Sequence, residues 1–116
     1  MPNVAAGGTA VAVNPEIIHR LLLSAETATY GGTWVDIGTY RKDGAIHVDG
    51  FNGDTVVIDG SSASTKPADS DNGDVYIDST VITGDGHYKA PNPPRWIKAR
   101  LTRVSGTVTV AYLGSR

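Results

Sequence analysis

Histidines and aspartates are the residues of this sequence that could support catalysis or metal binding. The chain has three histidines, far apart and without the spacing of metal ligands, namely His19, His47 and His87. The aspartates that could pair across strands as catalytic carboxylates are Asp36, Asp49 and Asp59. No motif flanks them, and the chain has no cysteine, no GxSxG motif and no Gly-rich loop ending in Lys-Ser or Lys-Thr. We therefore predict a protein that is not an enzyme, with no catalytic residue and no cofactor.

The stretch DSDNGD (69–74) has the acidic spacing of a calcium loop. Gly73 stands where the fifth loop position needs a ligand, and Thr80 stands where the twelfth needs Glu. The segment is therefore not an EF-hand. A calcium site of another kind and a plain Asx-rich turn are the two interpretations left, and we predict no bound metal.

One segment places a tryptophan beside basic residues. In RWIKARLTRVSGTVTVAYLG, alternation puts Trp96, Lys98 and Arg100 on one face of a strand, away from the core. Because Trp and Arg are enriched in interface hot spots, we predict that this face contacts another protein. The predicted interface residues are Trp96, Lys98, Arg100, Tyr88, Pro93 and Pro94. In the alternative interpretation Trp96 packs on Pro93 and Pro94 of its own chain.

The elements that must position these residues are strands. The chain has 116 residues, enough for one domain, and it is rich in Val and Thr, which favour strands, and in Gly and Asp, which favour turns. We expect strands at 9–13, 17–24, 33–40, 45–49, 54–59, 74–82, 95–103 and 107–113. Polar loops are expected at 61–73 and 84–94. Asn14, Pro15 and Glu16 would also suit the start of a helix, but we favour a strand after them.

Two tight connections are expected between these strands. A turn around Phe51-Asn52-Gly53 joins 45–49 to 54–59, and the second connection joins 95–103 to 107–113 in a hairpin. The second would set two apolar rows side by side on the core face, namely Ile97, Ala99, Leu101, Val108, Val110 and Tyr112. The sequence predicts an all-β fold, a single antiparallel β-sandwich of about eight strands, jelly-roll or Ig-like. Residues 1–14 would be an N-terminal arm or edge strand and residues 15–116 the sandwich domain.

Charge is divided unevenly along the chain. All ten Asp lie within residues 36–85, whereas residues 86–116 carry six basic residues and no acidic one. These segments could attract each other between subunits, could steer the basic end to an acidic partner, or could neutralise each other within one sandwich. Nucleic acid is not expected as a partner, because the face of Trp96 has one aromatic residue and the rest of the chain is acidic. No membrane partner is expected, since no apolar run could span a bilayer, and we interpret the N-terminus as mature sequence.

Three segments carry a resemblance. TYGGTWVDIG, VVIDGS and PPRWIKARLTRVSGTVTVAYLG resemble the small all-β virion proteins of tailed bacteriophages, from Thr29 onward. Those proteins are capsid decoration (cement) proteins, head fibres or tail-associated sandwiches. The resemblance implies a structural, oligomeric role without catalytic residues. The N-terminal VAAGGTAVAVNPEIIHRLLL has no counterpart there and would be an arm onto the capsid or a partner subunit.

The resemblance makes a capsid decoration protein that stabilises the phage head our leading prediction. Its partners would be the major capsid protein and itself, most simply as a homotrimer. It would be made in the host cytoplasm and lie on the capsid surface of the virion. A tail or neck structural subunit is one alternative. The other is a carbohydrate-binding module of a tail fibre or secreted enzyme, which would need exposed aromatics drawn from Tyr30, Trp34, Tyr40, Tyr76, Tyr88 and Trp96.

Overall fold

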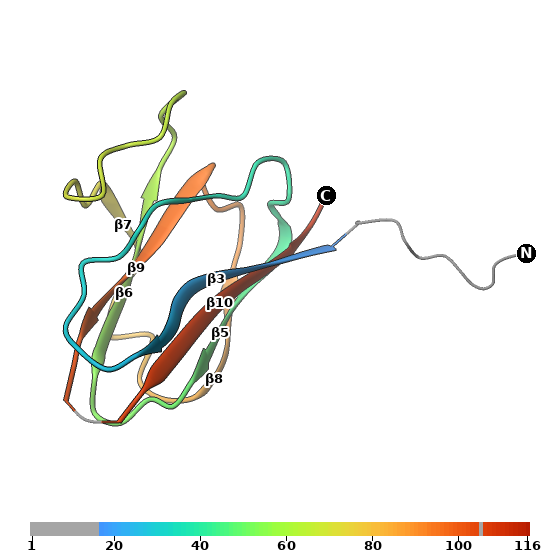
Figure 1. Ribbon diagram of the computed structural model, residues 1–116. Helices are drawn as coiled ribbons and strands as arrows, with labels where there is room; N and C mark the ends of the chain where they lie inside the picture. Colours follow the sequence, from blue (N-terminus) through green and yellow to red (C-terminus); the bar gives the residue numbers. More distant parts are fainter. Residues whose placement is uncertain (1–16, 105) are drawn as a thin grey trace, which may run out of the picture.

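Eight antiparallel strands make up the part of the chain that the computed structural model describes, residues 17–104 and 106–116. They are β3 (Ile17–Glu26), β4 (Val35–Asp36), β5 (Lys42–Asp49), β6 (Thr55–Ser61), β7 (Asp74–Ile77), β8 (Gly86–Ala90), β9 (Trp96–Thr102) and β10 (Val108–Ser115). Two four-stranded sheets, β3-β10-β5-β8 and β4-β9-β6-β7, pack face to face (Figure 1). The predicted antiparallel sandwich is confirmed. The expected strand at 9–13 and the arm at 1–14 lie outside the described residues.

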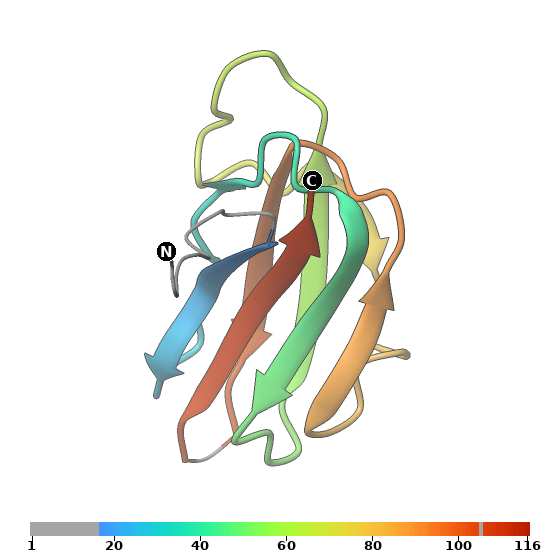
Figure 2. The ribbon, with the colours of Figure 1, turned by 90° about the vertical axis from the view of Figure 1, so that its right-hand side faces the viewer.

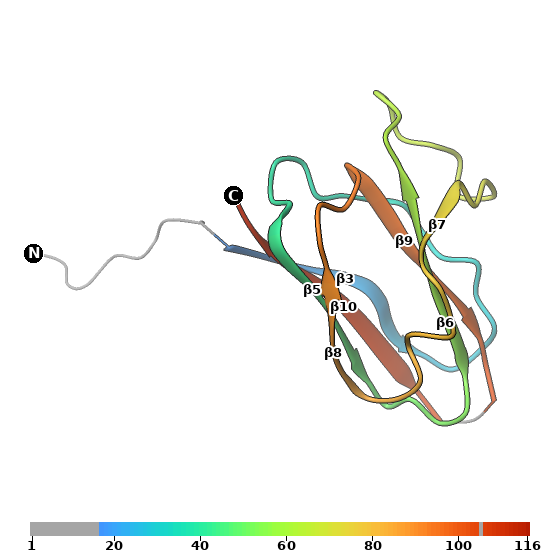
Figure 3. The ribbon, with the colours of Figure 1, turned by 180° about the vertical axis from the view of Figure 1, so that it is seen from behind.

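The order of the strands is that of a jelly roll. Among the described strands the first pairs with the last, the second with the seventh, the third with the sixth and the fourth with the fifth. Every connection except β6–β7 crosses from one sheet to the other, as the two layers seen from behind show (Figure 3). Of the two sandwich types left open by the sequence, the chain adopts the jelly roll.

The expected hairpin of 95–103 and 107–113 is wrong. β10 bonds β3 and β5, β9 bonds β4 and β6, and so β9 and β10 lie in opposite sheets. The same holds for β5 and β6. The physical reason is that alternation reports which face of a strand is buried and not which strand it bonds. Two apolar rows can meet across a sandwich as well as side by side within one sheet.

The residues expected in the core are in the core. Buried side chains of β9 and β10 meet across the two layers, and they are Ile97, Ala99, Leu101, Val108, Val110 and Tyr112. Facing rows of β5 and β6 complete the core with Ile46, Val48, Val56 and Ile58, all fully buried. The alternation of the sequence therefore identified the core-facing residues of β9 and β10 correctly.

Several element bounds differ from the prediction. The segment that could have been helical is the strand β3, as favoured. Of 33–40 only two residues are strand, because Asp36 accepts a hydrogen bond from the Gly38 amide (2.8 Å) and the chain turns there with a positive φ of 58° at Gly38. The strand expected at 74–82 ends at Ile77. The loop expected at 84–94 contains β8, whose short alternation is flanked by glycines and prolines that indicate loop.

One end of the core is closed by Tyr112. Its hydroxyl donates to the Tyr40 carbonyl at 2.7 Å. Glycines flank the ring because a Cβ at Gly44 or Gly114 would come within 2.8 Å or 2.4 Å of the Tyr112 hydroxyl oxygen.

The described residues contain no helix that is long and apolar enough to cross a membrane.

Candidate functional site

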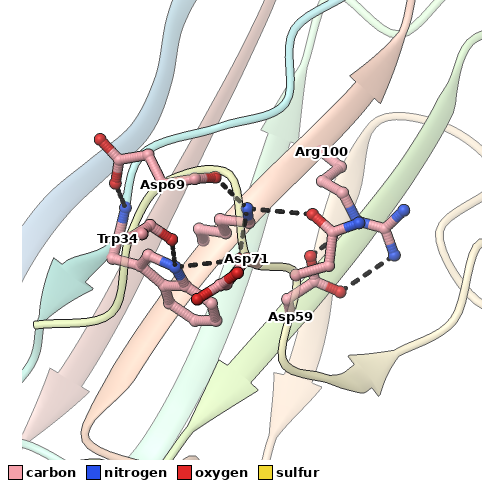
Figure 4. A network of polar contacts seen from close by, with 8 residues as sticks. Trp34, Asp59, Asp69, Asp71 and Arg100 are labelled. Atoms are coloured by element: carbon pink, nitrogen blue, oxygen red, sulfur yellow. Dashed lines mark hydrogen bonds and ion pairs between the residues drawn. The ribbon is translucent and has the colours of Figure 1, made fainter.

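The face of β9 predicted to contact another protein is covered by the chain itself. The connection from β6 to β7, residues 62–73, folds over this face (Figure 4). Lys98 is fully buried, Trp96 is 8% exposed, and the Arg100 side chain is 33% exposed. The expectation that this row projects into solvent is therefore wrong for Trp96 and Lys98. Contact of this face with a partner stays a prediction, and it would require the loop 62–73 to move.

Lys98 is held by oxygen atoms of that loop. Its Nζ donates to the carbonyls of Asp69 (2.7 Å) and Asp71 (2.9 Å) and to the side-chain oxygen of Asn72 (3.1 Å). Three acceptors match the three N–H donors of an ammonium. Burial lowers the pKa of Lys98, and the charge of Asp59 acts in the opposite direction. The loop is thus built around a buried cation supplied by the neighbouring strand.

The acidic stretch 69–74 turns its oxygens toward Lys98. Backbone carbonyls and an amide oxygen are ligands that Ca²⁺ favours, and here they surround the Lys98 ammonium. One carboxylate oxygen of Asp69 accepts the backbone amide of Trp34 at 3.0 Å. The described residues contain no group of three or more histidine, aspartate or glutamate side chains placed to hold a metal ion. The described polar contacts of this stretch are therefore with Lys98 and Trp34 of the same chain.

Trp34 is the second anchor of the loop, and the sequence analysis did not identify it. Its ring nitrogen donates to the carbonyls of Ala68 (2.9 Å) and Asp71 (3.1 Å), and only 3% of the residue is exposed. The Lys98 ammonium lies 5.2 Å from the centre of its ring, a cation–π contact. The sequence placed Trp34 in the strand expected at 33–40, and nothing in it indicated that the loop 62–73 packs against this ring.

Arg100 completes the row through an ion pair. Its Nε and Nη2 donate to the two carboxylate oxygens of Asp59 at 2.6 Å and 3.0 Å, and the Asp59 side chain is fully buried. These hydrogen bonds raise the pKa of Arg100. A bidentate pair of this kind fixes both side chains in one geometry. The ion pair of Arg100 therefore lies within one sheet, because Asp59 is on the adjacent strand β6.

The other predicted interface residues are divided between the two sheets. The ring nitrogen of Trp96 donates to the Ala63 carbonyl at 3.0 Å, and the Arg95 guanidinium stacks 5.1 Å from the ring centre. Pro93 is buried and Pro94 is half-buried, both just before β9. Tyr88 lies in β8 of the opposite sheet, where its hydroxyl donates to the Gly84 carbonyl at 2.6 Å. The six residues do not form one surface.

The uneven charge of the chain is partly neutralised inside one sandwich. Three arginines of the basic C-terminal part pair with aspartates of the acidic middle: Arg95 with Asp36, Arg100 with Asp59 and Arg103 with Asp54. The hydrogen bond from Arg95 holds the pKa of Asp36 below its usual value. Of the three interpretations of the charge pattern, neutralisation within one chain is the one these contacts match.

The outer face of the other sheet carries all three histidines. Cross-strand partners form one row of Leu21, Ala111, His47 and His87, and a second row of His19, Leu113, Ala45 and Lys89. The rings of His47 and His87 stack with centroids 4.3 Å apart. Ile17 is 67% exposed and Leu21 49% exposed at the β3 side of this face, which is toward the viewer in Figure 2. Comparison of the chain with family models, curated proteins and solved structures finds no match.

Proposed function

We propose that the protein is a non-enzymatic virion structural protein, a capsid decoration protein that binds the shell of a tailed phage and stabilises the head. The observation that carries the proposal is the outer face of the β3-β10-β5-β8 sheet, where Ile17 and Leu21 are exposed (67% and 49%), while the loop 62–73 covers Trp96 and Lys98 on the outer face of the opposite sheet. The sequence resemblance to small virion proteins supports the same class. Jelly rolls also recur in viral capsid proteins.

The β3 edge adds a second binding feature to this face. The edge strands of the two sheets are β3, with ten residues, and β8, β7 and β4, with five, four and two residues. Among the described residues β3 bonds β10 alone. A long edge without Lys or Pro offers unpaired backbone N–H and C=O groups to another chain. Exposed apolar side chains beside such an edge suit burial against a protein surface.

The carbohydrate-binding alternative receives less support from the same geometry. A glycan platform would need two or more exposed aromatic rings on one face. Both tryptophans are buried, and Tyr40, Tyr76 and Tyr88 are partly buried against the core. Tyr30, at 38%, is the most exposed of the described Trp, Tyr and Phe residues. A surface built for protein contact accounts better for exposed isoleucine and leucine.

The test is binding to phage heads. Shells of the encoding phage, assembled without this protein, are mixed with the purified chain, sedimented, and heated to measure their rupture temperature. We expect binding and a higher rupture temperature, and we expect Leu21→Asp to abolish both. Val81→Asp, at another exposed apolar residue (53%), is the matched control and should bind like the wild type. Failure of the wild type to bind shells would refute the proposal, as would equal losses for the two variants.

A further inference from the structure

We propose that the end of the sandwich where β5 begins and β8 and β10 end binds a carboxylate-rich segment of the partner protein. Two open hollows lie there, with volumes of about 420 Å³ and 580 Å³, and they share Arg41, Lys42 and Asn92 in their walls. Arg116 lines the first hollow and Lys89 lines the second. This inference deepens the proposed function, because it names the chemistry of the surface that the protein would meet.

The fold brings these basic residues together from distant parts of the sequence. Lys42 begins β5 and is the cross-strand partner of Ser115, next to the last residue of the chain. Lys89 is the partner of Ala45 near the end of β8. The start of β5 and the ends of β8 and β10 lie at the same end of the sheet, the upper end in Figure 2. The jelly-roll order therefore creates a basic end that no stretch of the sequence displays.

Arg41, Lys42 and Lys89 at this end form no described ion pair, unlike Arg100 of β9. Within residues 17–104 and 106–116, the ion pairs engage Lys66, Arg95, Arg100 and Arg103, and none includes Arg41, Lys42 or Lys89. All three of the latter residues are exposed. Among the described residues that line the two hollows, Asp43 is the one acidic residue, and Arg41, Lys42, Lys89 and Arg116 are basic.

Arg116 has a fixed position in the wall. Its guanidinium stacks 5.1 Å from the centre of the Tyr40 ring, and Nη2 donates to the Tyr40 hydroxyl at 3.0 Å. Arginine held against an aromatic ring presents its N–H fork in one orientation, which suits a carboxylate. The first hollow thus combines a fixed guanidinium with the exposed side chains of Arg41 and Lys42.

The other end of the same sheet is acidic, which favours a short acidic ligand over a long polyanion. Glu26 ends β3, Asp49 ends β5, and Asp85 directly precedes β8. A long polyanion such as nucleic acid would extend from the basic end over these carboxylates and be repelled. A short acidic peptide segment can end within the hollows. The opposite charges of the two ends would also orient the protein on an acidic surface before contact.

The experiment measures anisotropy of fluorescein-labelled hexaglutamate with the full chain, with labelled hexaglutamine and labelled oligothymidylate as comparison probes. We expect saturable binding of hexaglutamate that weakens as salt rises, and about tenfold weaker binding for Lys42→Glu and for Lys89→Glu. Lys66→Glu makes the same change of charge on the loop 62–73 and should bind like the wild type. Equal weakening by Lys66→Glu, binding of hexaglutamine as tight as hexaglutamate, or tighter binding of oligothymidylate would each overturn the inference.

Shell binding separates this inference from the proposed function. If Lys42→Glu, Lys89→Glu and the wild type bind shells equally well, the proposed function stands and the acidic contact is refuted. If the wild type binds hexaglutamate as described but no shells, the basic site stands and the proposed function fails.

Discussion

Trp34 and Lys98 donate hydrogen bonds to the same carbonyl oxygen, that of Asp71, at 3.1 Å and 2.9 Å. One donor belongs to the connection before β4 and the other to β9, so two segments of one sheet hold the loop 62–73 at a common point. On the same face of β9, Trp96 donates to the Ala63 carbonyl and Arg100 to the Asp59 carboxylate. Their polar groups are satisfied by their own chain.

The first prediction concerns Lys98→Met, which keeps the length of the side chain and removes its three hydrogen bonds. Because the carbonyls of Asp69 and Asp71 would lose the charged donor of a buried side chain, the free energy of unfolding should fall by about 3 kcal/mol. Cleavage within residues 62–73 should also become faster in limited proteolysis. Chemical denaturation and mass spectrometry of the fragments measure the two effects.

Lys66→Met is the control for that change. Lys66 forms an exposed ion pair with Asp69 at 3.7 Å, which should contribute at most about 0.5 kcal/mol. If the Lys98 and Lys66 variants have equal stability and equal proteolysis of the loop, Lys98 does not organise it.

The second prediction concerns Trp96→Ala. The ring is 8% exposed and bonds the Ala63 carbonyl, so its removal should lower the free energy of unfolding by about 3 kcal/mol. The oligomeric state in light scattering should not change. Weaker assembly with unchanged stability would instead favour the original hypothesis that Trp96 anchors a contact with another protein.

The sequence was sufficient to predict the sandwich and its core, because burial imposes a period of two on every strand. It could not predict that β9 and β10 lie in different sheets, since both arrangements bury Leu101 and Val110. Nor could it predict that Lys98 is buried. A charged residue on the outer row of a strand indicates solvent unless a loop covers it, and the folding of residues 62–73 onto Trp34 is a contact between distant segments.

The third prediction concerns the glycines around Tyr112. A Cβ at Gly114 would lie 2.4 Å from the Tyr112 hydroxyl oxygen and 2.5 Å from the Tyr40 carbonyl oxygen. Gly114→Ala should therefore lower the free energy of unfolding by about 2 kcal/mol or more. Gly31→Ala is the matched control, because nothing lies within 4 Å of its Cβ position. Thermal denaturation of both variants decides, and equal melting temperatures would contradict the packing described at Tyr112.

The fourth prediction concerns acid stability. Burial raises the pKa of Asp54, but hydrogen bonds from the amides of Val104 and Asn52 and the pairing with Arg103 outweigh it, so the pKa lies below 3.8. The folded protein therefore binds this proton less tightly than the unfolded chain. The stability that Asp54 contributes is present above pH 3.8 and is lost as the pH falls through the folded pKa.

Asp54→Asn tests this linkage. The variant should be less stable than the wild type near neutral pH, and the difference between them should shrink as the pH falls below about 4. Urea denaturation at a series of pH values measures both curves. Parallel curves down to low pH would show that Asp54 does not contribute to the acid sensitivity of the fold.

We propose that the protein binds a phage shell through the β3-β10-β5-β8 sheet while the loop 62–73 stays folded over β9. Hydrogen–deuterium exchange of the protein, free and bound to shells, tests it most directly. We predict slower exchange on binding in β3, whose far edge bonds no other described strand, and at the start of β5, with unchanged exchange in residues 62–73. Protection centred on residues 62–73 and β9, or no protection anywhere in the chain, would contradict the account.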